Sequence, residues 1–253
     1  MGLKYLILVI SLGKRNNIIK YTSKLLEDYS KKINIELKII NNYDNFKKSK
    51  CHILFSKTEI INYYLDLYDR IIYLDDTCIV SPNTPNLFDL VPENKLGAYI
   101  ESNDFFRKEG GGLGNWGVES IKNAYNYYSK QEHNNNLTYS PDFVMINTGV
   151  MVLSKCHKYL FNTDNYTLDF LSFGDQCFIS YQINKNNSEL FDIGTKYNTV
   201  GSVLLQNRRK LHKLINTDKH MIFHVTKGSG NYRENILKKL FSLLHPWNFK
   251  GVN

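Results

Sequence analysis

Continuous apolar runs alternate with amphipathic stretches in the first forty residues of the chain. The run over residues 6–11 carries no charge, which is typical of a strand buried on both faces of a parallel sheet. Residues 14–31 place apolar side chains at helical spacing and predict a helix. Residues 33–40 then predict a second strand.

The same alternation continues to residue 80. A helix is predicted over residues 57–67, with Ser56 as its N-cap and Glu59 at the capping-box position. It leads into an apolar strand over residues 70–74. The resulting β-α-β-α-β order predicts an α/β fold, Rossmann-like, with a mostly parallel, right-handed central sheet flanked by helices.

The remaining sequence predicts shorter elements. The predicted helices lie at 118–130, 174–183 and 233–244, and the predicted strands at 96–101, 190–193 and 221–225. Five glycines over residues 109–117 predict a flexible or tightly turned loop. Residues 143–153 predict a strand pair that is interrupted at residues 147–149.

Two adjacent carboxylates, Asp75 and Asp76, follow the apolar strand in the stretch IIYLDDTCIV. Ligands of open α/β sheets bind beyond the carboxyl ends of the strands, and a buried carboxylate needs a partner or a metal. Mg²⁺ and Mn²⁺ bind through one or two carboxylates together with substrate phosphates. The pair therefore predicts a site for a divalent cation and its phosphates, with a capped turn as the alternative interpretation.

Two polar pairs interrupt or follow apolar segments further along the chain. Asn147 and Thr148 break an apolar run, which is typical of a β-bulge or of a backbone close to a ligand. Asp175 and Gln176 open a predicted helix, where the helix dipole favours an acid.

The segment IFHVTKGSG combines three features suited to a phosphate ligand. His224 follows a short apolar strand and is a candidate metal ligand. Lys227 and the backbone amides from Gly228 onward are candidates to cradle a phosphate. A structural role for a lone His is the alternative at this point.

Composition narrows the class of protein. The 253 residues are 42% hydrophobic and 13% aromatic, which is typical of a globular chain, and the net charge of +8 favours anionic partners. The charge is mostly Lys spread along the chain, so a solvated surface is favoured over a nucleic-acid partner. The four Cys are scattered, which argues against a zinc site or a disulfide framework and favours a cytoplasmic chain. The apolar run over residues 5–12 is too short to be a transmembrane segment.

Taken in order, these segments resemble the nucleotide-sugar glycosyltransferases with the A-type fold, most of all glycosyltransferase family 8. YDRIIYLDDTCIV resembles the strand that carries the DxD motif, and INTGVMVLSK resembles the Asn-Ala-Gly-Val segment. SFGDQCFIS resembles the Asp-Gln segment, and IFHVTKGSG resembles the metal-binding His before a Gly/Lys loop. The resemblance extends from the first strand to about residue 230.

The resemblance implies roles for particular residues. A Mn²⁺ or Mg²⁺ cofactor on the donor diphosphate would be held by Asp75, Asp76 and His224. The catalytic residues beside the anomeric carbon would be Asn147, Asp175 and Gln176. The donor-binding residues would be Ser11, Arg15, Lys57, Asp75, Asp76, Thr148, Lys227 and Gly228.

The resemblance also implies a reaction. A hexosyl group would move from a nucleotide sugar, a UDP-sugar, to a hydroxyl of a glycan, protein or lipid acceptor, with retention. We expect one domain over residues 1–253, with a nucleotide-binding half at about 1–100 and a donor-sugar and acceptor half at about 101–230. A basic C-terminal helix would occupy 231–253 and is open to weak contact with a membrane surface.

The DxD stretch departs from the family pattern. Aligned without a gap, Thr77 stands at the second acid, whereas a one-residue gap brings Asp76 to that position. Thr is a weaker metal ligand than a carboxylate, so a catalytically inactive nucleotide- or glycan-binding module of the same fold stays an alternative. A sugar-nucleotide pyrophosphorylase would need a glycine-rich loop after the first strand, where SLGKRNN has one Gly.

Overall fold

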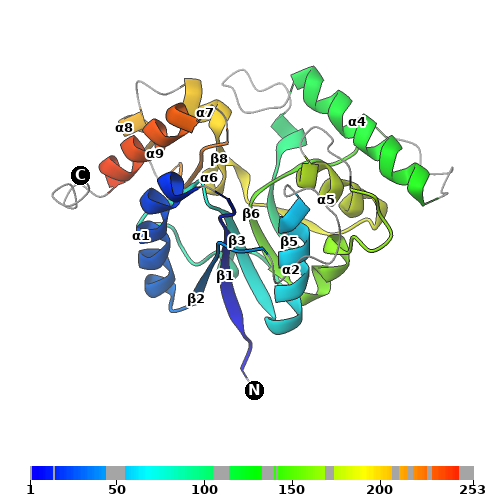
Figure 1. Ribbon diagram of the computed structural model, residues 1–253, viewed down its shortest axis with the longest axis horizontal. Helices are drawn as coiled ribbons and strands as arrows, with labels where there is room; N and C mark the ends of the chain where they lie inside the picture. The colour runs from blue at the N-terminus through cyan, green and yellow to red at the C-terminus, as the bar shows by residue number, and fades with distance from the viewer. Residues whose placement is uncertain are drawn as a thin grey trace.

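The structure is a computed structural model in which helices surround a central sheet (Figure 1). It describes residues 2–13, 15–43, 55–104, 114–132, 140, 142–168, 174–206, 211–215, 219–226 and 230–244.

In the part of the chain that the structure describes, six strands form the central sheet, in the order β2 (Glu36–Ile40), β1 (Tyr5–Ile10), β3 (Arg70–Asp75), β6 (Ile146–Ser154), β5 (Leu96–Ile100) and β7 (Leu190–Asp192). Strand β1 pairs in parallel with β2 and β3, and β5 pairs in parallel with β7. Strand β6 runs antiparallel to both of its neighbours. The predicted α/β fold with a mostly parallel, helix-flanked sheet is confirmed.

Apolar side chains of the strands alternate between two cores. One core packs against α1 (Asn16–Ile33) and contains Ile7, Val9, Ile72 and Leu74. The other packs against α2 (Ser56–Leu67), α4 (Gly114–Gln131) and α5 (Gly174–Lys185), and contains Leu6, Leu8, Ile71 and Tyr73. Burial on both faces explains why β1 and β3 are uninterrupted apolar runs.

A smaller sheet beside α1 has the order β4 (Cys78–Val80), β9 (Ile222–His224) and β8 (Thr199–Val200). Helix α9 (Gly230–Leu244) packs against α1 and the small sheet through a third core (Figure 1). Because Cys78 pairs with His224, this sheet brings the end of β9 next to the residues that follow β3.

The segment at 143–153 differs from its prediction. It contains one continuous strand, β6, and not a strand pair. Its register with β5 shifts between two consecutive residues of β5. Ala98 pairs with Met151, whereas Tyr99 pairs with Asn147. Residues 148–150 lie between these two pairs and bulge away from β5, while β6 pairs with β3 from Val150 onward, so the polar interruption is a bulge within one strand.

The start of α2 also differs. Ser56 is the first helical residue, and Phe55 occupies the N-cap position without a side-chain hydrogen bond, so the predicted capping box is wrong. Phe55 is fully buried, and the Thr58 hydroxyl donates to its carbonyl at 2.6 Å. Packing of Phe55, rather than a side-chain cap, fixes where the helix begins.

Helix α4 begins earlier than predicted. It includes Gly114 and Gly117 of the predicted glycine loop, while 109–113 lies outside the described residues. A glycine inside a helix costs about 1 kcal/mol relative to alanine. Burial of Ile121 and Tyr125 on the same helix offsets this cost.

The other described elements are short: α3 (Leu87–Leu90), η2 (Glu101–Asp104), η3 (Lys155–Phe161), α6 (Gly194–Tyr197), α7 (Gly201–Gln206) and α8 (Leu211–Ile215). Within the described ranges, no helix combines the length and apolar character needed to cross a membrane.

Candidate functional site

Asp75, the last residue of β3, is the centre of a charged cluster. Its Oδ1 lies 3.1 Å from the Lys57 ammonium and accepts a 2.6 Å hydrogen bond from the Tyr73 hydroxyl. Its Oδ2 lies 3.0 Å from His224 Nε2. Burial alone would raise the pKa of Asp75, but Lys57 and His224 outweigh it and hold the pKa well below its usual range. The carboxylate is therefore charged at neutral pH.

Lys57, in the first turn of α2, links Asp75 to the start of α5. Its Nζ lies 2.8 Å from Asp175 Oδ2 and 3.2 Å from Thr148 Oγ1. The Thr148 hydroxyl also donates to Asp175 at 2.9 Å. Burial favours a lower pKa for Lys57, but the two carboxylates outweigh it and raise the pKa above its usual value. One fixed cation thus holds two acids from different elements.

Asp76 faces a different group of residues. Its carboxylate forms an ion pair with Arg15 at 2.6 Å and accepts from the Ser11 hydroxyl at 2.9 Å. Its carbonyl accepts from Thr22 at 2.9 Å. Asp76 is 3% exposed, and burial raises its pKa although Arg15 opposes the shift. The two adjacent acids therefore do not point into one site.

The bulge of β6 places Asn147 against His224. Asn147 Oδ1 accepts from the Gly149 amide at 3.1 Å and from Asn198 Nδ2 at 2.9 Å. His224 Nδ1 lies 3.2 Å from that oxygen and 3.1 Å from Asn198 Oδ1. Since Nδ1 faces carbonyl oxygens, it carries the proton. Nε2 then presents its lone pair toward Asp75, so a cation, either a second proton or a metal ion, is needed between them.

Glu101 connects the bulge of β6 to α5. Asn147 Nδ2 donates to Glu101 Oε2 at 3.3 Å, and Gln176 Nε2 donates to the same oxygen at 3.0 Å. Glu101 is 5% exposed. Sequence reasoning missed this residue; the signal available was an acid at the end of an apolar strand, as at Asp75.

The metal site implied by the sequence is only partly assembled. Within the described part of the chain, no three His, Cys, Asp or Glu side chains lie close enough to hold one ion. Asp75 and His224 are adjacent, whereas Asp76 is turned to Arg15. These two residues fit a cation whose remaining ligands come from substrate phosphates and water, which is common for Mg²⁺.

Arg233 on α9 is a second residue that sequence reasoning missed. Its Nη2 donates to the Thr226 carbonyl at 3.0 Å. Burial and the charge of Arg15 lower its pKa, whereas the carboxylates of Asp76 and Asp75 act in the opposite direction. Two guanidinium groups and two carboxylates therefore interact in this corner of the site.

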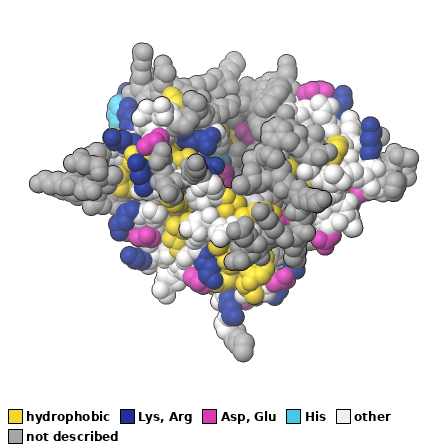
Figure 2. Space-filling view, viewed as in Figure 1, with side chains coloured by type: hydrophobic (Ala, Val, Ile, Leu, Met, Phe, Trp, Pro, Cys, Tyr) yellow, Lys and Arg dark blue, Asp and Glu magenta, His cyan; other side chains and the backbone are white. Residues whose placement is uncertain are grey.

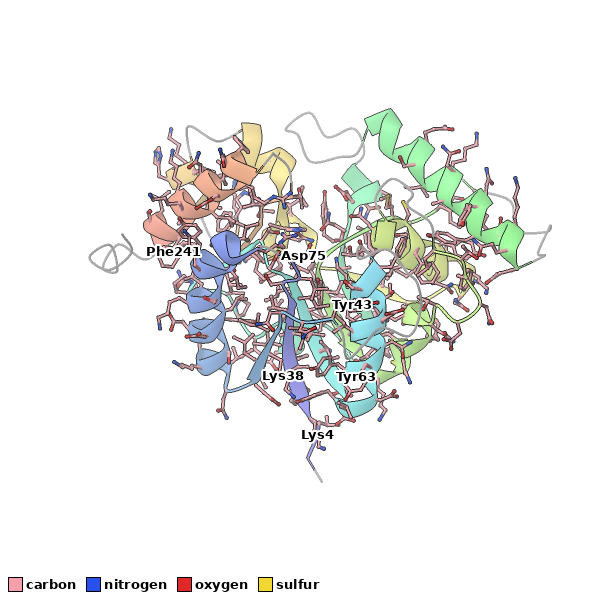
Figure 3. All side chains as sticks on the ribbon, viewed as in Figure 1. Lys4, Lys38, Tyr43, Tyr63, Asp75 and Phe241 are labelled. Atoms are coloured by element: carbon pink, nitrogen blue, oxygen red, sulfur yellow. The ribbon has the colours of Figure 1, made fainter. Side chains whose placement is uncertain are left out.

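Asp75 lies above the end of the central sheet, between the α1 and α9 side and the α5 side (Figure 3). Carboxyl ends of β1 and β3 meet here, because these parallel strands pair from Tyr5 with Arg70 to Ile10 with Asp75. The site therefore occupies the position at which open α/β sheets bind ligands.

The family model described as Glycosyl transferase family 8 matches residues 4–228. The chain belongs to this family. A search of curated proteins found no match.

Solved glycosyltransferases share the fold of this family 8 chain. A glycosyltransferase involved in glycosylation of the major capsid of PBCV-1 has a TM-score of 0.58 and 12% identity, over 93% of this chain and 99% of that one. The bifunctional glycosyltransferase WbbM has a TM-score of 0.54 and 12% sequence identity. The match covers 96% of this chain and 50% of WbbM. The galactosyltransferase LgtC, in complex with donor and acceptor sugar analogues, has a TM-score of 0.50 and 11% sequence identity. The match covers 96% of each chain.

In this family 8 chain, the described site residues fall into two groups. The Lys57 cluster contains Lys57, Asp75, Glu101, Asn147, Thr148, Asp175, Gln176 and His224. The Asp76 cluster contains Ser11, Arg15 and Asp76. The predicted phosphate residues Lys227 and Gly228 lie outside the described residues.

Proposed function

We propose that this family 8 glycosyltransferase moves a hexosyl group from a nucleotide sugar, a UDP-sugar, to a hydroxyl of a glycan, protein or lipid. The observation that carries the proposal is the Lys57 bridge. It holds Asp75, at the predicted diphosphate end, and Asp175, at the predicted sugar end, on one ammonium group. A donor bound across this bridge has its phosphates and its sugar fixed by the same partly buried cation.

The Asp76 cluster suits the nucleoside end of the donor. Ser11 follows β1, and its hydroxyl and the Arg15 guanidinium are held in place by the Asp76 carboxylate. This proposal places the nucleoside end of the donor among the first hundred residues. We propose that Lys227 and Gly228 bind the diphosphate of the donor.

The Lys57 cluster suits the sugar end. Asp175 carries a carboxylate for positive charge that develops at the anomeric carbon, and Gln176 and Asn147 carry carboxamides for the sugar hydroxyls. Glu101 holds both carboxamides in fixed orientations. Such preorganised groups stabilise a transition state because they do not reorganise during the reaction. Retention is proposed from the family resemblance.

For the metal, we propose that Asp75 and His224 hold Mn²⁺ or Mg²⁺. Asn147 and Asn198 orient the ring so that Nε2 faces Asp75, an arrangement that metal-binding His residues commonly have. When bound, the ion would neutralise charge on the departing diphosphate. Thr77 and Asp76 are not part of this ligand set.

A thermal-shift panel tests the donor. The melting temperature is measured with UDP-, GDP-, ADP- and TDP-sugars, each with and without Mn²⁺, because a ligand that binds the native state raises it. We expect a UDP-sugar to raise the melting temperature, and we expect the rise to be larger when Mn²⁺ is present. The absence of a shift with every nucleotide sugar would contradict the proposal.

Two isosteric variants separate the roles of the adjacent acids. Asp75→Asn should lose the Mn²⁺-dependent part of the shift, whereas Asp76→Asn should weaken the metal-free part and keep the Mn²⁺ increment. Exposed Asp142→Asn is the control. Equal loss of the Mn²⁺ increment in both variants would restore the three-ligand set implied by the sequence.

The position of Thr77 favours a second candidate, a non-catalytic nucleotide- or glycan-binding module. Thr77 is 3% exposed, and its carbonyl accepts from the Val225 amide at 3.2 Å, so it joins β4 to the end of β9. Donor binding without donor hydrolysis or transfer to any sugar acceptor would support the module. Release of UDP from a bound UDP-sugar excludes it.

A further inference from the structure

Arg233 is a cation beside the site that the proposed function leaves without a role. It lies in the first turn of α9, beyond residue 228, where the match to the family model ends. Its Nη2 donates to the Thr226 carbonyl at 3.0 Å, and the Thr226 amide donates in turn to the His224 carbonyl at 3.0 Å. These two hydrogen bonds place the guanidinium at the end of β9, next to the residues that follow His224.

The end of β9 also lies beside the two adjacent acids. The Val225 amide donates to the Thr77 carbonyl at 3.2 Å, and Thr77 directly follows Asp76 in the chain. The charges of Asp76 and Asp75 both act on the Arg233 guanidinium. Helix α9 packs on α1 at this side of the sheet (Figure 1). Arg233 therefore lies at the border between the Asp76 cluster and the metal site proposed at Asp75.

The charge of Arg233 is not neutralised by contact with the described part of the chain. Asp76 already holds Arg15 through both of its carboxylate oxygens, at 2.6 and 2.7 Å, and no described carboxylate forms an ion pair with Arg233. Arg233 is partly buried, and burial together with the charge of Arg15 lowers its pKa. A cation in the first turn of a helix is also unfavourable, because the positive end of the helix dipole lies there. Such a charge needs an anion from outside the chain.

One end of the guanidinium is open to a ligand. Nε of Arg233 has no hydrogen-bond partner and no accessible surface. Nη1 also has no partner among the described residues, but it is not closed to solvent. Nη1 and Nη2 lie in one plane and form a fork of donors, which suits two oxygens of a phosphate group. The accessible donors therefore favour a phosphate as the missing anion.

We infer that Arg233 binds the diphosphate group of the donor directly, as a cation that α9 supplies from outside the segment matched by the family model. The inference rests on the proposed function for the identity of the anion as a nucleoside diphosphate. In that function the diphosphate joins a nucleoside at the Asp76 cluster to a sugar at the Lys57 cluster, and Arg233 lies at the border of the two. Its charge would give donor binding a part that needs no metal ion.

Calorimetric titration without metal tests the inference with three probes: UDP, uridine and inorganic pyrophosphate. Wild type should bind UDP and, more weakly, pyrophosphate. Arg233→Gln should raise the Kd for both by about tenfold, the effect of losing one hydrogen bond to a charged group, and leave the Kd for uridine unchanged. Arg233→Lys keeps the charge without the fork and should fall between the two. Lys238→Gln is the matched control, because it removes the same charge from an exposed position of α9.

Melting temperatures without ligand show whether each variant is folded, and Arg233→Lys decides the test if Arg233→Gln alters the fold. An unchanged Kd for UDP overturns the inference and leaves the proposed function standing. An equal loss of affinity for uridine and UDP also overturns it, because Arg233 then acts only through the fold. Pyrophosphate binding that depends on Arg233, in a protein that binds no nucleotide or nucleotide sugar, supports the phosphate site and contradicts the proposed function. The two failures are therefore distinguishable.

Discussion

Gly149 lies so close to the ring of His224 that no side chain fits between them. A Cβ atom on Gly149 would lie 1.8 Å from Cε1 and 2.1 Å from Nδ1 of His224. Close approach, and not an unusual backbone angle, therefore requires glycine here. The same approach lets Asn147 Oδ1 reach both the Gly149 amide and the His224 ring.

Replacing Gly149 with alanine should displace His224 from Asp75. We expect Gly149→Ala to lower stability by about 1–3 kcal/mol, as overpacking does, and to abolish the Mn²⁺-dependent thermal shift. Gly97→Ala is the control, because its Cβ would meet Val91 at 2.6 Å in the core and not the site. A Gly149→Ala variant that kept the Mn²⁺ increment would show that His224 is not a ligand.

Removal of the Lys57 cation should affect the reaction more than the fold. Lys57→Met keeps the apolar length of the side chain but leaves Asp75 and Asp175 without their shared partner. We expect the transfer rate to fall by about 100-fold, the usual effect of losing one preorganised donor. Initial rates with a UDP-sugar measure this, and Lys158→Met, which removes a half-exposed lysine paired with Asp66, is the control. Full activity of Lys57→Met would rule out the bridge as part of the mechanism.

The sequence predicted that Asp75 and Asp76 lie at the end of a strand, but it did not predict that their side chains point in different directions. Adjacent residues at the end of a strand point to opposite sides, so Asp75 meets Lys57 while Asp76 meets Arg15. Glu101 carries a local signal that sequence reasoning did not use, an acid at the end of an apolar strand, whereas nothing local marks Asn198. Their contacts with Asn147 arise only when β5 and the small sheet reach β6.

At the scale of elements, η3 depends on an uncharged histidine. The Ser154 backbone amide donates to His157 Nδ1 at 2.9 Å, so this nitrogen must be unprotonated. His157 Nε2 lies 3.4 Å from the Asn94 carbonyl and donates to it. Burial lowers the pKa of His157, and Arg70 lowers it further.

This arrangement predicts a loss of stability in mild acid. Unfolded His157 takes up a proton below about pH 6.5, whereas the folded side chain stays neutral to a lower pH. The unfolded state then binds more protons, so the free energy of unfolding falls as pH drops through this window. Urea unfolding at pH 7.5 and 5.5 should show a smaller fall for His157→Gln, whose amide oxygen accepts the same bond. An equal fall in the free energy of unfolding of wild type and His157→Gln would show that His157 is not the source of the pH dependence.

The elements were predicted as well as their local signals allowed. Apolar runs over residues 6–10 and 71–74 identified β1 and β3, because burial on both faces leaves no charged position inside these runs. The antiparallel direction of β6 depends on connections far along the chain and has no local pattern. The start of α2 was misplaced because packing of Phe55 overrides the capping signal at Ser56.

At the scale of the whole molecule, α9 completes a core. Ile236, Leu237, Leu240 and Phe241 pack with Tyr21 and Leu25 of α1. Basic side chains are spread over the face seen in Figure 2, several of them on the α1 and α9 side, and do not form a single stripe. Of the basic helix predicted over 231–253, residues 245–253 lie outside the described residues, and the described part, α9, has one face with exposed basic side chains and one buried apolar face.

Truncation of one buried side chain tests this packing. Leu240 is fully buried, so Leu240→Ala should lower the free energy of unfolding by about 2–5 kcal/mol. Leu243, 37% exposed on the same helix, is the control and should cost far less when replaced by alanine. Urea unfolding measures both. Similar small losses would mean that α9 contributes little to the folded state.

The pairing of β3 with antiparallel β6 has a consequence for the order in which the protein acquires its site. Arg70 pairs with Ser154, so the sheet cannot close until a long intervening segment has been synthesised. His224 joins Asp75 later still. Contacts of such sequence separation form slowly. On the ribosome, the residues of the first β-α-β unit therefore emerge early, whereas the proposed donor site is complete only after His224 has emerged.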